Sequence, residues 1–132
     1  MRFARWVFAL CGIYGIVALV PLYFMEASSG KDYPPPITHP EFYYATIGVA
    51  LAWQVAFLII SFDPRRFRPI MLTGVLEKLG FGVPAVILYC QGRSPAPILY
   101  TGSLDLLMGA VFLVAYFQTA PQPATLAATP VS

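Results

Sequence analysis

The sequence predicts an all-α integral membrane protein, an antiparallel bundle of four transmembrane helices. Hydrophobic residues make up 58% of the 132 residues and charged residues only 11%, far from the balance of a globular domain. A helix that crosses a bilayer needs roughly 20 mostly apolar residues. Four stretches meet this requirement, at residues 4–25, 42–62, 70–90 and 98–117. They place one transmembrane domain at residues 1–118, and the uncharged tail at 119–132 is expected to be disordered and cytoplasmic.

The first two spans are the most apolar parts of the chain. No charged residue occurs in residues 6–25 or 42–62. The first run is longer than the ~7–15 apolar residues of a cleaved signal peptide, so we expect it to be retained as a helix. Thr38 and Glu41 have the spacing of a capping box, which predicts that Thr38 caps the second span.

The third span follows the second after a short connection that contains Pro64 and Pro69. This short connection predicts that the second and third spans pack as an antiparallel pair. Gly80, Gly82 and Pro84 loosen one turn of the third span, because proline cannot donate a helical hydrogen bond. We expect a kink there, or else a break that exposes backbone carbonyls to a ligand or ion.

Positive charge is distributed unevenly between the loops. One side has only Lys31 and Arg93. The other side has Arg2, Arg5, Arg65, Arg66 and Arg68. Cytoplasmic loops carry the excess of lysine and arginine, so we expect a multi-pass protein with both termini cytoplasmic.

Five polar residues inside the spans are the candidate functional residues. They are Tyr14, Gln54, Glu77, Lys78 and Asp105. Counted along the helices, Gln54, Glu77 and Lys78 lie roughly 12–14 Å deep, and Asp105 lies about one turn nearer the outside. Such residues either hold the helices together or form a ligand site or proton relay.

Lys78 and Asp105 are expected to form an ion pair, because each would otherwise be an unpaired charge in the membrane. Glu77 and Lys78 point about 100° apart on a helix, so they are not expected to pair well with each other. Glu77 would then contact Gln54, Tyr14 or water.

The sequence shows no pattern of an enzyme. It has no nucleophile elbow, no phosphate-binding loop and no cluster of metal ligands, so no catalytic residue, metal or cofactor is predicted. Cys11 and Cys90 lie at different depths, too far apart for a disulfide. His39, the only histidine, is expected to pack in a loop or make a pH-sensitive contact. No basic stripe suggests nucleic acid.

Three segments carry a resemblance to known proteins: residues 39–44 (HPEFYY), 63–69 (DPRRFRP) and 76–78 (LEK). Together they resemble an uncharacterised group of small four-span bacterial membrane proteins, and the layout of residues 1–118 is loosely similar to DoxX-like families. The resemblance implies a four-helix bundle in the bacterial inner (plasma) membrane. It implies no catalytic residue.

These observations favour a non-enzymatic protein that binds a hydrophobic molecule such as a lipid or quinone, or an accessory subunit of a membrane complex. The expected partners are the lipid bilayer and either a hydrophobic small molecule or a membrane protein. The alternative is a small proton-coupled transporter that uses Glu77, Lys78 and Asp105.

Overall fold

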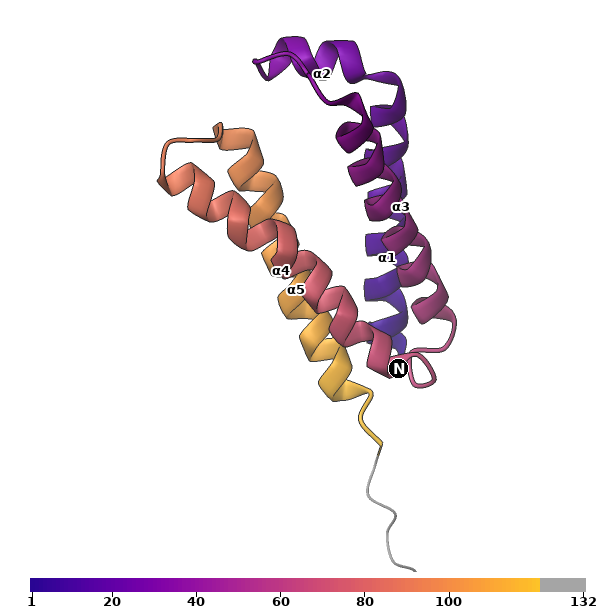
Figure 1. Cartoon of the computed structure of the whole chain (residues 1–132). Helices are drawn as coiled ribbons and strands as arrows, with labels where there is room; N and C mark the ends of the chain where they lie inside the picture. The colour runs from indigo at the N-terminus through magenta and orange to yellow at the C-terminus, as the bar shows by residue number, and fades with distance from the viewer. Residues whose placement is uncertain (122–132) are drawn as a thin grey trace, which may run out of the picture.

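The computed structural model describes residues 1–121. It confirms an all-helical chain with four helices long and apolar enough to span a membrane (Figure 1). The elements are α1 (Arg2–Leu19), the 3₁₀ helix η1 (Val20–Phe24), α2 (Glu26–Asp32), α3 (Pro40–Phe62), α4 (Arg68–Cys90) and α5 (Ala96–Gln118). Most of the expected tail, residues 122–132, lies outside the described residues. Thr119, the first residue assigned to that tail, is buried and caps α5, donating from Oγ1 to the Ala115 carbonyl at 2.9 Å.

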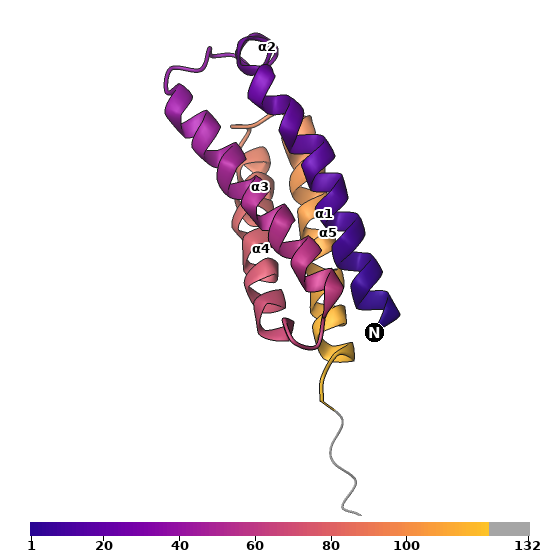
Figure 2. The same ribbon diagram turned by 90° about the vertical axis from the view of Figure 1, so that its right-hand side faces the viewer.

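The long helices form two pairs, α1 with α3 and α4 with α5. Seen from the side, the α1–α3 pair lies in front of the α4–α5 pair (Figure 2). The pairs converge at the end that holds the N-terminus and the connection at residues 63–67, which we call the closed end. They diverge toward the end that holds α2 and the connection at residues 91–95, which we call the open end (Figure 1).

The expectation that the second and third spans pack against each other is wrong. Helices α3 and α4 follow each other through a short connection, but they contact each other little because they diverge from the closed end. Glycines explain why α1 packs with α3 and α4 packs with α5 instead. A Cβ at Gly12 of α1 would lie 2.9 Å from the Gln54 carbonyl oxygen of α3, and a Cβ at Gly82 of α4 would lie 2.8 Å from the Gly102 carbonyl oxygen of α5. Small residues let helix backbones approach this closely in a membrane.

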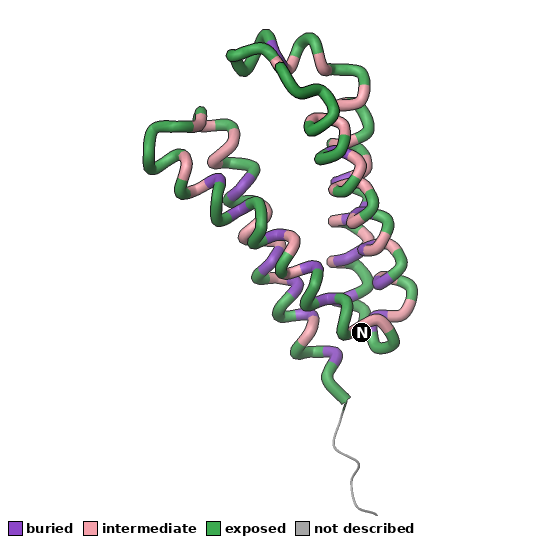
Figure 3. Tube along the Cα trace, in the orientation of Figure 1, coloured by how far each residue is buried: buried purple, intermediate pink, exposed green. Residues whose placement is uncertain are grey.

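Aromatic side chains fill the closed end. The Phe8 and Phe112 ring centroids are 4.3 Å apart in a stacked arrangement, and those of Phe57 and Phe112 are 4.9 Å apart edge to face. All three side chains are fully buried, and Met71 and Ile60 pack with them. Figure 3 shows the buried positions along the facing sides of the helices and mostly exposed positions at the open end. The closed end is therefore the packed core of the bundle.

The open end contains α2, a short helix that sequence analysis treated as loop. Two tyrosines of α3 attach it and η1: Tyr44 donates to the Glu26 carboxylate at 2.6 Å, and Tyr43 donates to the Leu22 carbonyl at 2.7 Å. The Ser29 and Tyr43 hydroxyls lie 3.3 Å apart.

The predicted capping box is wrong. His39 rather than Thr38 is the N-cap of α3, Pro40 occupies its first turn, and no side chain caps it. Glu41 is then only two residues past the cap, one short of the position from which a capping box can close. Its carboxylate instead lies 3.1 Å from His39 Nδ1.

The predicted break in the third span is also wrong. Helix α4 runs without interruption from Arg68 to Cys90, with Pro84 inside it. A bend of the α4 axis at Pro84 stays a prediction.

Candidate functional site

A cavity of about 750 Å³ lies between the two helix pairs. All four long helices line it. It extends from Leu22 of η1, near the open end, to Lys78 of α4. Most of its wall is apolar, with Val49, Leu104 and Met108 among the lining residues. Its polar lining is concentrated around Lys78, so the cavity has one polar end and a longer apolar part.

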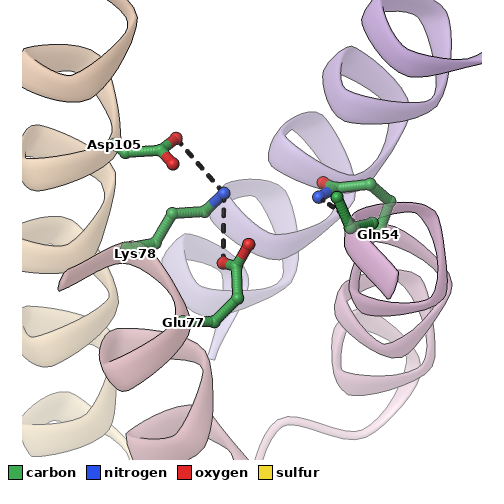
Figure 4. A network of polar contacts seen from close by, with 5 residues as sticks. Gln54, Glu77, Lys78 and Asp105 are labelled. Atoms are coloured by element: carbon green, nitrogen blue, oxygen red, sulfur yellow. Dashed lines mark hydrogen bonds and ion pairs between the residues drawn. The ribbon is translucent and has the colours of Figure 1, made fainter. Parts of the chain in front are cut away.

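The polar end is built around the Lys78 ammonium. Lys78 Nζ lies 3.3 Å from Asp105 Oδ1, to which it donates a hydrogen bond, so the predicted ion pair is confirmed. Nζ also lies 3.2 Å from Glu77 Oε2 (Figure 4). Glu77 and Lys78 were not expected to pair well, and they lie at ion-pair distance without a hydrogen bond. They come this close because the flexible four-carbon stem of a lysine can reach around its own helix. We call Glu77, Lys78 and Asp105 the ion cluster.

The three members of the ion cluster differ in exposure. The Lys78 side chain is only 5% exposed, whereas those of Glu77 and Asp105 are 17% and 18% exposed. Lys78 Nζ lies 5.4 Å from the centroid of the Phe57 ring, on which the cation can rest favourably. Lys78 is thus in contact with the aromatic core at the closed end through Phe57.

Glu77 is the least satisfied of the three. Its Oε2 atom is buried and has no hydrogen-bond partner among the described residues, because its contact with Lys78 has ion-pair distance without hydrogen-bond geometry. A buried polar atom without a partner is uncommon in native structures. It marks Glu77 as a residue with capacity for a further donor.

Gln54 lies across the cavity from the ion cluster (Figure 4). It is 4% exposed, and its Nε2 donates to the Ala50 carbonyl at 3.1 Å. A Cβ at Gly15 would overlap its side chain, so α1 holds it in place. The expected contact between Gln54 and Glu77 is not present among the described hydrogen bonds.

Tyr14 also lines the cavity, and its side chain is half exposed. Its hydroxyl makes no hydrogen bond to Glu77 within the described part of the chain. All five candidate residues from the sequence therefore line one cavity, although only the ion cluster is in direct contact.

Sequence reasoning missed the aromatic wall of this cavity, formed by Trp53 of α3 and Phe81 of α4. It also missed Phe57, the contact beneath Lys78. Trp53 precedes Gln54 and Phe81 lies one turn after Lys78, so proximity to polar residues was a signal. Which aromatic residues face inward depends on helix rotation, which an almost uniformly apolar sequence does not reveal.

A second hollow of about 730 Å³ lies at the open end between η1, α2 and α3. Glu26 and Tyr44 line it, but they bond to each other. Residues 1–121 contain no group of three metal-ligating side chains. Comparisons with known protein families, with curated proteins and with solved structures find no match to this chain.

Proposed function

We propose that this protein is non-enzymatic and binds a hydrophobic molecule with a polar head, such as a lipid or a quinone, in the cavity between its helix pairs. The observation that carries the proposal is the cavity itself, with its apolar wall and its ion cluster at one end. Ligand pockets have volumes of ≈ 300–1,000 Å³, mainly apolar walls and a few polar groups that orient the ligand. A cavity of about 750 Å³ falls within this range.

The polarity of the cavity sets the orientation of the ligand. The polar head would lie beside Gln54, Glu77 and Asp105, and the apolar portion would extend past Val49 and Leu104 toward the open end. Divergence of α3 from α4 gives this part of the bundle a side that other helices do not cover (Figure 1). A lipid-soluble molecule could enter there from the bilayer.

We place the closed end on the cytoplasmic side of a bacterial inner membrane, with both termini cytoplasmic. Five of the arginines lie at or near this end, which agrees with the distribution expected of cytoplasmic loops. One of them, Arg68, packs its guanidinium 3.7 Å from the centroid of the Tyr116 ring. The cavity would then open toward the outer leaflet.

Cysteine labelling tests this orientation. In a background without Cys11 and Cys90, a cysteine at Arg66 should react with a membrane-impermeant reagent only after cells are permeabilised, whereas a cysteine at Arg93 should react in intact cells. The reverse pattern would overturn the orientation.

Native mass spectrometry of the protein released from native membranes tests ligand binding. We expect a retained hydrophobic molecule. Ala50→Phe should displace it, because Ala50 lines the cavity, whereas Ala52→Phe on the exposed face of α3 should retain it. A protein with no retained molecule, or equal retention in both variants, would contradict the proposal. A retained protein instead of a small molecule would favour an accessory subunit.

A second function, proton-coupled transport, is favoured by one specific observation. The cavity reaches the carboxylates of Glu77 and Asp105, as a proton-coupled site requires. Reconstitution into vesicles that enclose a pH-sensitive dye would test it. Ligand-dependent proton movement that Glu77→Gln abolishes would support transport. If no proton movement is detected, ligand binding without transport is the remaining function.

A further inference from the structure

The polar end of the cavity has an unbalanced charge. The ion cluster contains two carboxylates, Glu77 and Asp105, and one ammonium, Lys78. The other titratable groups that face it are Cys11 and Tyr14 of α1, and α3 contributes the neutral amide of Gln54. Along the cavity wall, with both carboxylates ionised, the total is therefore one negative charge.

The cluster presents this negative charge to the cavity. Lys78 is 5% exposed and rests on Phe57, so its ammonium is mostly covered, whereas the side chains of Glu77 and Asp105 are 17% and 18% exposed. Glu77 Oε2 has no hydrogen-bond partner in the described chain. Gln54, 96% buried, turns its amide toward the same space (Figure 4), and its Oε1 accepts no hydrogen bond from the described residues. Glu77 Oε2 itself is buried beside Lys78 Nζ, so a ligand head would meet the accessible parts of the Glu77 and Asp105 carboxylates and the Gln54 amide.

Three aromatic side chains also line the cavity. Trp53, Phe81 and Tyr14 line the cavity from α3, α4 and α1. Aromatic faces attract cations, most strongly where water is excluded. Carboxylate oxygens and aromatic rings together are suited to a cation and poorly suited to an anion.

We propose that the cavity selects hydrophobic cations, such as amines or quaternary ammonium amphiphiles, and that the cation and a proton compete for the one negative charge of the ion cluster. This inference rests on the proposed function, because it names the ligand class of the same cavity. An uncompensated charge is costly inside a membrane protein. In the empty cavity one proton on the carboxylate pair neutralises the cluster, and in the complex the ligand cation does so while that proton passes to water.

Tetraphenylphosphonium and tetraphenylborate are suitable probes, because they match in size and shape and differ in the sign of charge. Binding to the full-length protein in nanodiscs of zwitterionic lipid can be measured by equilibrium dialysis, with empty nanodiscs subtracted. We expect tetraphenylphosphonium to bind at least about tenfold more tightly than tetraphenylborate. If binding of one cation releases one proton, the affinity for tetraphenylphosphonium should fall by up to about tenfold for each unit by which the pH decreases. This holds within the pH range in which the ion cluster takes up the proton.

Glu77→Gln and Asp105→Asn should each abolish this pH dependence and weaken cation binding about tenfold or more. Both substitutions are made because either one alone could prevent folding, and a single variant that folds is enough to test the prediction. Glu41→Gln, at an exposed carboxylate outside the cavity, is the matched control and should bind as the unmodified protein does. Ala50→Phe should reduce binding of any probe that occupies the cavity.

The outcomes separate this inference from the proposed function. If tetraphenylborate binds as tightly as tetraphenylphosphonium and Ala50→Phe blocks both, the cavity binds hydrophobic molecules and the cation preference is wrong. Cation binding without pH dependence would overturn the proton competition. If neither probe binds above empty nanodiscs, the cation inference is wrong, and the retained-ligand measurement alone decides the proposed function.

Discussion

The closed and open ends of the bundle are built from the same four helices, yet their interiors differ. At the closed end, Phe8, Phe57 and Phe112 pack within 6 Å of one another by ring centroid and are fully buried. Toward the open end, the pairs α1–α3 and α4–α5 separate around a cavity of about 750 Å³. The difference shows that packing concentrated at one end holds the pairs together while a cavity remains between them toward the other end.

The ion cluster lies at the boundary between these two regions. Lys78 rests on Phe57 of the core, and Glu77 and Asp105 line the cavity. The cluster therefore belongs to both regions, and substitutions in each region should have distinct consequences.

The largest effect on stability is expected from the core. Phe112→Ala should reduce the free energy of unfolding by on the order of 3–5 kcal/mol, because it leaves a void among buried aromatic rings. The matched variant Phe81→Ala, in the cavity wall, removes a side chain that is 44% exposed and should change stability by less than about 1 kcal/mol. Unfolding in mixed micelles would measure both. Equal losses would show that the two ends are packed alike.

The next effect is expected from the ion cluster. Lys78→Met leaves two partly buried carboxylates without a cation and should lower stability by about 2.5–3.5 kcal/mol. Asp105→Leu should have a smaller effect, because Glu77 remains as a partner at 3.2 Å from Lys78 Nζ. The yield and stability of folded protein in nanodiscs would report this order.

Adding Glu77→Gln and Asp105→Leu to Lys78→Met should recover part of the loss, since a neutral site is better than a lone buried charge. If the three substitutions were additive, the residues would not be coupled, contrary to the contacts in Figure 4.

The smallest effect is expected from two glycines that differ only in surroundings. Gly12→Ala should destabilise the α1–α3 pair by about 1–3 kcal/mol, because the added Cβ would lie 2.9 Å from the Gln54 backbone carbonyl oxygen. Gly80→Ala meets nothing within 4 Å and should be neutral or stabilise α4 by up to about 1 kcal/mol. A melting temperature that falls in the first variant and is unchanged or raised in the second would support this difference. A lower melting temperature in both variants would contradict it.

The sequence alone was enough to predict four spanning helices. Their apolar length and the prolines near the starts of α3, α4 and α5 are local properties. It also predicted the Lys78–Asp105 pair, since opposite charges at similar depth in a membrane have few other partners. The capping box failed because Pro40 shifted the helix start by one residue.

Which helices pack together was decided by the tertiary structure. A short connection places α3 beside α4 at one end only, whereas close glycine contacts pair α1 with α3 and α4 with α5 along their lengths. The sequence by itself determined that the chain is a bundle of membrane-spanning helices with polar residues at mid-depth. Only the tertiary structure decided that these residues line a cavity, because nearly uniform apolar helices carry little information about which face turns inward.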